Sequence, residues 1–402
     1  LSLPVSILPI STAVPLPLWI LLGLLDGALL VLLFWRKWAP RMMLVSLGGT
    51  ALVLLLAVLI SQWTAATPAI NDAQGQPLPG SIASLEKVNL NGSEQWISIR
   101  GKNINNPVLL YLGAGGPGAG GFATRSLFEP LEDHFVIVSW DEPGTGKSYR
   151  ARPIESLNRK QFVEDARALS EYLRVRFNQE KIYVYGVSWT SILGIWLVQE
   201  YPDLYAAYIG NGQMVNTTEN DVMGYQLALD YLVEKGDEQK LQQLKQNGPP
   251  PYQGAGLGLK YLAYLDVLNE IMGTPHYALI IPLMPMFSPE YGLADKVDHF
   301  LGLYQSFEAV YPQLSDLDFT TQAPRLNVPV YFLLGKQDVN AMSSLAEDYF
   351  NLLQAPRKEL IWFNNGHGLS RDSMDQFVDV MVNKVLKDNP TRPLKAAALK
   401  DA

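Results

Sequence analysis

The chain begins with two long apolar runs. Residues from about 17 to 35 and from about 43 to 63 are almost wholly apolar, and Asp26 is the one charged residue of the first run. Each run is close to the roughly 20 residues that a helix needs to cross a bilayer. The pattern predicts a two-helix transmembrane hairpin within residues 1–64. The alternatives are a buried helical hairpin of a soluble protein and a cleavable signal peptide.

The charges around these runs predict an orientation. The link between them carries Arg36, Lys37 and Arg41, whereas residues 1–16 and 64–86 contain neither Lys nor Arg. Positively charged links remain preferentially in the cytoplasm. We therefore expect a multi-pass protein of the cell membrane whose two ends, and hence everything after residue 64, lie outside the cytoplasm.

A different pattern follows a linker at residues 65–80, which are rich in Ala, Pro, Asn, Gln and Gly. Short apolar runs alternate with turn residues and with a clear helical periodicity at 159–178. This alternation predicts an α/β fold with a mostly parallel sheet and helices on both faces. The expected strands are 84–90, 95–100, 108–112, 135–139, 181–187, 205–210, 328–335 and 358–363.

Residues 213–326 interrupt the alternation with a helical pattern. Helices are expected at 217–231, 238–246, 257–272 and 294–311, the first of them capped by Thr217 or Thr218. A helical insertion of this size between two strands predicts a cap that covers the site and influences substrate choice. The cap divides the core into residues 81–212 and 327–390 and leaves 391–402 as a tail.

The strand expected at 181–187 runs through Gly186 into Ser188 and Thr190, and from there directly into a helical pattern. This arrangement is close to a nucleophile elbow, a tight strand-to-helix turn that exposes a serine hydroxyl above a sheet. In such proteins the acid and the histidine follow the serine in that order. Asp338 follows the strand at 328–335 and His367 follows the strand at 358–363. Ser188, Asp338 and His367 are therefore the expected catalytic residues.

Each of these groups has a task in acyl transfer. A serine hydroxyl is a weak nucleophile at neutral pH, so a neutral imidazole must accept its proton, and a carboxylate must orient that imidazole. Fixed N–H donors must stabilise the negative oxygen of the tetrahedral intermediate. We expect the backbone N–H groups of Trp189 and Gly116 to do this, because Gly116 lies in the glycine-rich run 113–121 after a strand. A phosphate-binding loop is the alternative, but no Gly-Lys-Ser/Thr ends this run.

Composition removes several other classes of function. The net charge of −8 at pH 7 argues against a nucleic-acid partner. The absence of cysteine excludes disulfides, thiolate metal sites and a cysteine nucleophile. With four histidines and no His-Glu-x-x-His spacing, we expect neither a metal nor a cofactor.

Over residues 80–388 the chain resembles the prolyl iminopeptidase-type α/β-hydrolases, in particular bacterial members anchored in the membrane. The resemblance rests on five motifs in the family's order: Gly115-Gly116-Pro117-Gly118, Asp141-Glu142-Pro143-Gly144-Thr145-Gly146-Lys147-Ser148, the elbow with Trp189, Gly335-Lys336-Gln337-Asp338 and Gly366-His367. The chain departs from the family at three points near the site. Ala114 replaces a histidine, Glu142-Pro143 replaces Gln-Arg, and Thr190 replaces the second glycine of the elbow.

The resemblance implies an aminopeptidase for short peptides, with proline at the amino end as the usual case. Carboxylates of the cap hold the free amino end in this family, so Glu219 and Asp221 are candidate substrate-binding residues, and Gly115 is a third. Their alternative role is to place negative charge at a helix N-terminus.

These observations predict a membrane-anchored serine hydrolase that works through an acyl-enzyme, with a short peptide as substrate. An esterase or lipase acting on membrane-derived acyl substrates is the alternative, since the apolar stretch 279–287 of the cap could line an acyl pocket. An inactive hydrolase fold that serves as a binding module is the second alternative.

Overall fold

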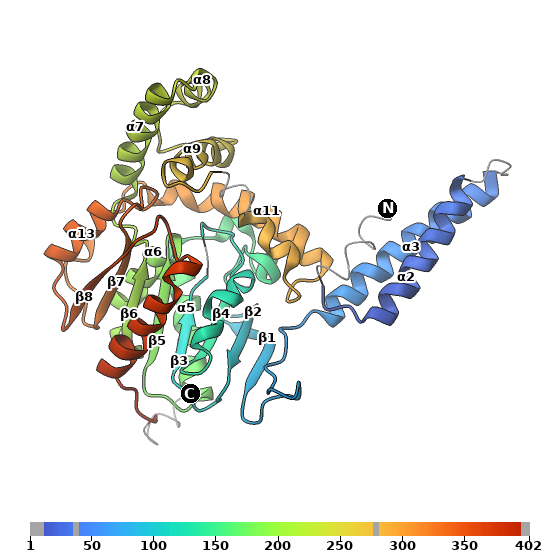
Figure 1. Ribbon diagram of the computed structural model, residues 1–402, viewed down its shortest axis with the longest axis horizontal. Coiled ribbons are helices and arrows are strands. Elements are labelled where there is room, and N and C mark those ends of the chain that lie inside the picture. Colours follow the sequence, from blue (N-terminus) through green and yellow to red (C-terminus); the bar gives the residue numbers. More distant parts are fainter. Residues whose placement is uncertain (1–11, 35–39, 114, 276–280, 395–402) are drawn as a thin grey trace.

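The computed structural model describes residues 12–34, 40–113, 115–275 and 281–394, and its centre is one eight-stranded sheet (Figure 1). The strand order is β1-β2-β4-β3-β5-β6-β7-β8. β1 pairs with β2, and β2 with β4, in antiparallel fashion, and all the other pairs are parallel. The bounds are β1 Ile82–Leu90, β2 Ser93–Gly101, β3 Val108–Tyr111, β4 Val136–Asp141, β5 Ile182–Val187, β6 Tyr205–Asn211, β7 Val330–Gly335 and β8 Lys358–Phe363. The predicted α/β fold and its strands are confirmed.

Helices cover both faces of this sheet because its central strands are apolar on both sides. One face packs against α5 (Arg159–Arg176), α6 (Trp189–Glu200) and α13 (Ser343–Leu352). The other face packs against α4 (Arg125–Phe128), α14 (Met374–Asp379) and η9 (Val380–Leu386). Because β3 to β8 run parallel, their carboxyl ends all lie at one edge of the sheet, where a ligand site of this fold is expected.

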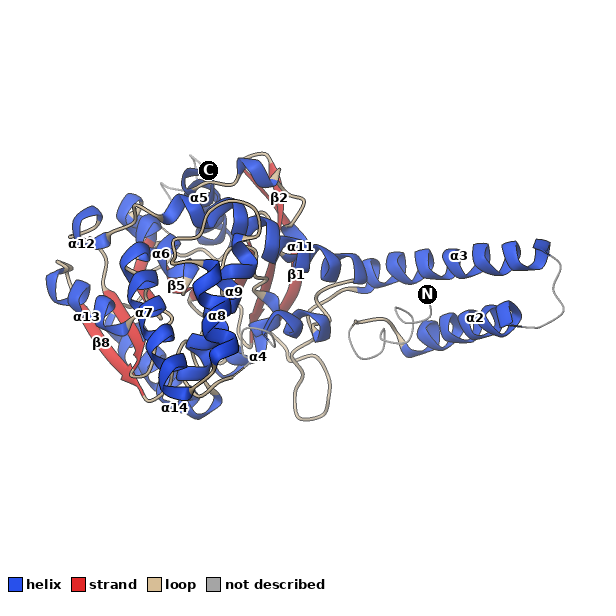
Figure 2. Ribbon diagram, turned by 90° about the horizontal axis from the view of Figure 1, so that it is seen from above, coloured by secondary structure: helices blue, strands red, loops and turns tan. Residues whose placement is uncertain are grey.

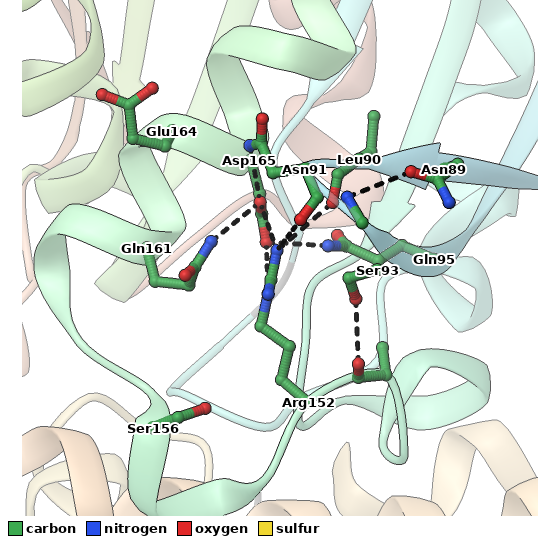
Figure 3. Close-up of polar contacts among 12 residues, drawn as sticks. Asn89, Leu90, Asn91, Ser93, Gln95, Arg152, Ser156, Gln161, Glu164 and Asp165 are labelled. Atoms are coloured by element: carbon green, nitrogen blue, oxygen red, sulfur yellow. Dashed lines mark hydrogen bonds and ion pairs between the residues drawn. The ribbon is translucent and has the colours of Figure 1, made fainter.

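A buried polar network joins the antiparallel β1–β2 hairpin to α5 (Figure 3). The carboxylate of Asp165 accepts two hydrogen bonds of 2.9 Å from the guanidinium of Arg152. It also accepts from the side-chain amides of Gln95 (2.7 Å), Asn91 (2.9 Å) and Gln161 (2.9 Å). Because a buried charge is tolerated only when it is paired and hydrogen-bonded, this network fixes the hairpin against the helix.

The cap lies above the carboxyl edge of the strands (Figure 1). Between β6 and β7 the longer helices are α7 (Thr217–Lys235), α8 (Glu238–Asn247), α9 (Leu257–Ile271) and α11 (Leu293–Val310). The helices predicted for this insertion are thus confirmed, but the N-cap of α7 is different. Asn216, and not Thr217 or Thr218, accepts the hydrogen bond from the backbone N–H of Glu219. The hydroxyls of Thr217 and Thr218 instead donate to the carbonyls of Leu314 and Ser315.

The N-terminal segment forms two antiparallel helices that extend away from the body, α2 (Leu16–Phe34) and α3 (Pro40–Thr64) (Figure 2). They pack together where the hydroxyl of Ser46 donates to the carbonyl of Leu29 (2.6 Å). Within the described residues one helix, at 44–64, is both long and apolar enough to cross a membrane, while the apolar helix at 16–32 is shorter. Two spans are therefore not established. Arg36 and Lys37, on which the predicted orientation rests, lie outside the described residues.

The segment predicted to be a linker is held against the core. Arg100 and Glu132 form a buried ion pair of 2.6 Å, and the same guanidinium donates to the hydroxyl of Thr67 (3.0 Å) and to the carbonyl of Pro68. The backbone N–H of Ala66 donates to the carbonyl of Pro289 in the cap (3.2 Å). These contacts fix the direction in which α3 leaves the body.

Candidate active site

Ser188 occupies the turn between β5 and α6 in a strained backbone conformation. Its φ is 54° and its ψ is −121°, a region that residues with a side chain rarely adopt. Its backbone N–H donates to the carbonyl of Asn211 at the end of β6 (3.1 Å), and its own carbonyl accepts from the backbone N–H of Ser191 (2.9 Å). The side chain is partly exposed at the carboxyl edge of the sheet. This geometry is that of a nucleophile elbow.

Thr190 stands at the position where the elbow usually has glycine, and its neighbours Gly113 and Gly186 have no side chains; a Cβ added to Gly113 would lie 3.6 Å from Cγ2 of Thr190. A Cβ added to Gly186 would lie 2.3 Å from the carbonyl oxygen of Thr190. The Thr190 hydroxyl donates to the carbonyl of Gly113 (2.9 Å) and accepts from the N–H of Val187 (2.9 Å). The threonine therefore ties the elbow to the glycine-rich loop that follows β3.

Asp338 and His367 meet across the ends of β7 and β8. Nδ1 of His367 lies 2.8 Å from Oδ2 of Asp338. Oδ1 of Asp338 accepts from the backbone N–H groups of Asn340 (3.0 Å) and Ala341 (2.9 Å). The carboxylate is buried, and all of these contacts orient it toward the imidazole. Nδ1 therefore faces the acid, and Nε2 remains for a second partner.

Gly212 brings this pair close to the elbow. It directly follows Asn211, whose carbonyl holds the N–H of Ser188. A Cβ added to Gly212 would lie 2.9 Å from Cε1 and 3.1 Å from Nδ1 of His367, and 3.3 Å from Oδ2 of Asp338. Glycine also suits the backbone here, because φ is 51°. The imidazole thus packs on the residue next to the one that anchors Ser188.

Two opposing effects act on the pKa of His367. Burial lowers it, while the charge of Asp338 and the hydrogen bond to that carboxylate raise it. Burial is the largest single effect, but the two contributions of Asp338 together outweigh it, so the pKa of His367 lies above its ordinary value. An imidazole of this kind is a stronger base than a free histidine, and it is protonated over a wider pH range.

The glycine-rich loop closes over the elbow in this structure. The backbone N–H of Trp189 donates to the carbonyl of Gly115 (3.2 Å), where φ is 61°. One of the two expected oxyanion donors is therefore already occupied. Gly116 lies beside the cap, because a Cβ added to it would be 3.5 Å from Cδ2 of Phe307.

Two carboxylates at the end of β4, Asp141 and Glu142, hold this loop. They belong to the motif at residues 141–148, but the sequence pattern did not indicate which groups they contact. Oδ1 of Asp141 accepts from the N–H of Gly121 (3.0 Å) and from the hydroxyl of Tyr291 in the cap (3.0 Å). Burial raises the pKa of Asp141 to about 7. Glu142 lies beside Trp189, the residue after Ser188: its Oε1 accepts from the indole N–H of Trp189 (2.9 Å).

Glu142 is buried, and its Oε2 has no hydrogen-bond partner among the described residues. Burial, together with the charge of Asp141, raises the pKa of Glu142 to about 8, while the N–H groups of Trp189 and Gly118 act in the opposite direction. A neutral carboxylic acid is therefore the main form of this side chain at neutral pH.

The two candidate carboxylates of the cap lie in different surroundings. Glu219 is exposed in the first turn of α7, where its side chain accepts from the amide of Asn216 (3.3 Å). Asp221 is buried, and the hydroxyl of Tyr311 donates to its Oδ2. Burial raises the pKa of Asp221 to about 6. The structure thus brings Asp221, but not Glu219, into the interior of the cap.

Aromatic rings connect Asp221 with the glycine-rich loop. The ring of Tyr311 stacks on that of Phe307, with centroids 5.1 Å apart, and Phe307 packs beside Gly116. Tyr261 contacts both rings, at 5.1 and 4.9 Å. Helix α7 also contacts the loop that follows β7 and carries Asp338: the side-chain amide of Asn220, the residue before Asp221, donates to the carbonyl of Asn340 (2.8 Å). Contacts through α7 and these rings therefore connect Asp221 with both the glycine-rich loop and the loop that carries Asp338.

In the part of the chain that the structure describes, no group of three His, Asp or Glu side chains is arranged to hold a metal ion. The site offers a hydroxyl, an imidazole and carboxylates, which suit acyl transfer.

Comparison with known proteins agrees with this arrangement. Residues 106–247 match a family model described as the alpha/beta hydrolase fold. A probable aminopeptidase, YbaC, of Bacillus subtilis is 29% identical over 296 residues, which cover 72% of this chain and 92% of that protein.

Solved structures with the same fold include a proline iminopeptidase of Mycobacterium smegmatis (16% identity, TM-score 0.55, 76% of this chain and 99% of that one). A second is a proline iminopeptidase-related protein of Thermus thermophilus (18% identity, TM-score 0.54, 77% of this chain and 98% of that one). These matches show that the chain is a hydrolase with the α/β-hydrolase fold, and that it is similar to a probable aminopeptidase and, in fold, to proline iminopeptidases.

Proposed function

We propose that the chain is a serine aminopeptidase anchored in a membrane, with Ser188 as nucleophile, His367 as general base and Asp338 as the acid that orients it. Nε2 of His367 accepts the Ser188 proton while Oγ attacks the substrate carbonyl, and the imidazolium then protonates the leaving amine. A water molecule attacks the resulting acyl-enzyme by the same route and releases the acid product. Two observations support this proposal: the elbow at Ser188, and the pair of Asp338 and His367, which lies close to Gly212.

The oxyanion of the tetrahedral intermediate is proposed to accept from the backbone N–H groups of Trp189 and Gly116. The carbonyl of Gly115, which now holds the Trp189 N–H, must turn away first. Glycines at 115 and 116 make that rotation sterically inexpensive.

The observation that carries the peptidase assignment is the position of Asp221. A substrate with a free amino end carries a positive charge, and a desolvated carboxylate surrounded by aromatic faces is a favourable partner for it. Asp221 has this environment, and the rings of Tyr311 and Phe307 lie between it and Gly116. We therefore assign amine recognition to Asp221, and not to the exposed Glu219. The backbone of Gly115 remains a candidate substrate contact.

The esterase alternative receives less support. It relied on the stretch 279–287 as an acyl pocket, yet Leu283 and Phe287 in this stretch have exposed side chains. Residues 279 and 280 lie outside the described residues.

Anchoring is proposed to involve both α2 and α3, since exposed leucines cover the outer surface of the two helices.

A rate comparison tests this function. We expect the full-length protein to cleave proline amide and other amino-acid amides, and to react with a fluorophosphonate probe at Ser188. Ser188→Ala should abolish both. Asp221→Asn should slow the amide substrates about a hundredfold while a small acetyl ester, which has no amino group, is hydrolysed normally. The matched control Glu219→Gln should change neither rate. Equal loss on both substrates in Asp221→Asn would remove the assignment of amine recognition.

A further inference from the structure

Helix α11 presents its apolar side to the outside. Val297, Phe300, Leu301 and Tyr304 follow the spacing i, i+3, i+4 and i+7 and form one stripe along the helix. Their exposed fractions are 60%, 41%, 38% and 43%. The opposite side is buried, and between the apolar residues Leu293 and Val310 at its two ends it is polar or small: Asp295, Lys296, Asp298, His299, Gly302 and Ser306. A helix at a water-exposed surface normally has the reverse arrangement.

Specific contacts hold α11 in this orientation. Asp295 forms a buried ion pair with Lys147 of the core (2.6 Å), and Asp298 pairs with Arg150 (2.8 Å). The hydroxyl of Ser306 donates to the carbonyl of Gly144 (2.8 Å). Rotation of the helix to bury its apolar stripe would leave these polar groups without partners, at a large cost in free energy. These contacts therefore keep the apolar stripe of α11 exposed.

Gly302 explains why the buried side must be small. A Cβ added to this residue would lie 2.5 Å from the carbonyl oxygen of Gly144. A Cβ added to Gly118 of the glycine-rich loop would lie 2.2 Å from the carbonyl oxygen of Gly302. The backbone of α11 therefore rests directly on the loops of the candidate active site.

The stripe continues into other apolar surface. Phe287 and Leu283, on the 3-10 segment Ile281–Phe287 that packs against α11, are 63% and 47% exposed. The N-terminus of α11 lies at the foot of α3: the hydroxyl of Ser61 accepts from the N–H of Leu293 (3.0 Å), and the amide of Gln62 donates to Asp295 (2.9 Å). Trp63, at the same end of α3, is 82% exposed. Figure 1 shows α11 beginning beside the base of the α2–α3 hairpin.

We propose that the stripe on α11, with Leu283 and Phe287, rests in the interfacial layer of the bilayer that holds the α2–α3 hairpin. The position of α11, whose N-terminal end is held at the foot of α3 by the contacts of Ser61 and Gln62, favours a lipid surface as the occupant. Aromatic side chains such as Phe300, Tyr304 and Trp63 are typical of this layer. This inference rests on the proposed membrane anchor and adds a second contact, made by the cap.

The contact has a consequence for the site. Phe307 packs beside Gly116, and Gly302 packs on Gly118, so α11 carries one wall of the glycine-rich loop. A bilayer that holds α11 fixes this wall in place. The helices α7 to α9 are then the part of the cap that is free to move when substrate enters.

The absence of cysteine allows a direct test with single-cysteine variants of the full-length chain. Val297→Cys reports on the stripe, Leu52→Cys reports on α3, and Val175→Cys is the matched control, an exposed valine (39%) on helix α5 of the core. Each variant is labelled with an environment-sensitive fluorophore and reconstituted in phosphatidylcholine vesicles with or without spin-labelled lipid.

We expect spin-labelled lipid to quench most of the emission at position 297 and at position 52, and to leave position 175 unchanged. Quenching at 52 but not at 297 would overturn the cap contact and leave the anchor standing. No quenching at either position would overturn both. A probe at 297 that is shielded from aqueous iodide, yet is not quenched by lipid, would indicate a protein partner and would also overturn the lipid contact.

Discussion

The backbone N–H of Trp189 donates to the carbonyl of Gly115 at 3.2 Å, so the residue after the elbow serine is bonded to the loop that should cooperate with it. The hydrogen bond gives the buried N–H a partner while no substrate oxygen is present. A tetrahedral oxyanion is a stronger acceptor than a neutral carbonyl, so it is expected to displace Gly115.

A structure of the protein after reaction with a fluorophosphonate checks this exchange. We expect the phosphonyl oxygen to accept from the N–H of Trp189, and the carbonyl of Gly115 to have turned out of hydrogen-bond range. The 2.8 Å contact between Asp338 and His367 should stay in place as an internal reference. If the bond between Gly115 and Trp189 survives in the adduct, Trp189 is not an oxyanion donor.

Gly212→Ala should damage catalysis far more than stability. The added Cβ would lie 2.9 Å from Cε1 of His367, so the imidazole must shift. A displacement of about 1 Å costs on the order of a hundredfold in rate. We expect a loss of that size in kcat/KM and in the rate of fluorophosphonate labelling.

Gly236→Ala is the matched control for this variant. Gly236 also has a positive φ, 74°, but nothing lies within 4 Å of its added Cβ. It should cost about 1 kcal/mol of stability, as should Gly212→Ala, through backbone strain. Equal catalytic losses in the two variants would show that the close approach of Gly212 to His367 has no role in catalysis.

Asp338→Asn should slow the reaction and move its pH dependence. An asparagine accepts the hydrogen bonds from Asn340 and Ala341, but it lacks the charge that raises the pKa of His367. The rate should fall by about 10³ to 10⁴. Since only the neutral imidazole acts as base, the residual activity should persist to lower pH than in the wild type. A pH–rate profile checks this, and an acid limb that stays in place or moves to higher pH would contradict the role of Asp338.

Glu142→Gln should stabilise the protein at alkaline pH. Because burial raises the pKa of Glu142 to about 8 from an ordinary value of 4.5, the folded state holds this proton more tightly than the unfolded state. The resulting contribution to stability is present below the unfolded pKa and is lost as the pH rises toward 8. Glutamine keeps an acceptor for the indole N–H of Trp189 and has no proton to lose. We expect Tm to rise by several degrees at pH 9 and to be unchanged at pH 5, as measured by thermal unfolding.

The contrast for this variant is Glu132→Gln, which breaks the buried ion pair with Arg100 and should lower Tm at both pH values. If Glu142→Gln instead lowers Tm at pH 9, the carboxyl group is ionised and stabilising in the folded protein.

Local patterns were sufficient to predict the strands, the helical cap and the chain order of Ser188, Asp338 and His367. Short apolar runs bounded by turn residues specify strands, and the elbow is a local turn whose neighbours are adjacent in sequence. The contact between Asp338 and His367 also follows from topology, because parallel strands β7 and β8 end side by side.

Other features depended on the tertiary structure. Glu219 and Asp221 looked equivalent along the chain. Residues two positions apart on an α-helix point to nearly opposite sides. Only the packing of α7 decided that Asp221, and not Glu219, faces Tyr311. The partner of Trp189 and the close approach of Gly212 to His367 join segments far apart in sequence.

Helix α11 is the clearest case. Its sequence determines an apolar stripe at 297, 300, 301 and 304, and such a stripe usually identifies the side that is buried in the core. The tertiary structure placed the stripe outward, because Asp295, Gly302 and Ser306 on the other side have specific partners in the core. Hydrophobic periodicity defines which residues of a helix share a side. Which side faces the interior depends on contacts with residues that are distant in the chain.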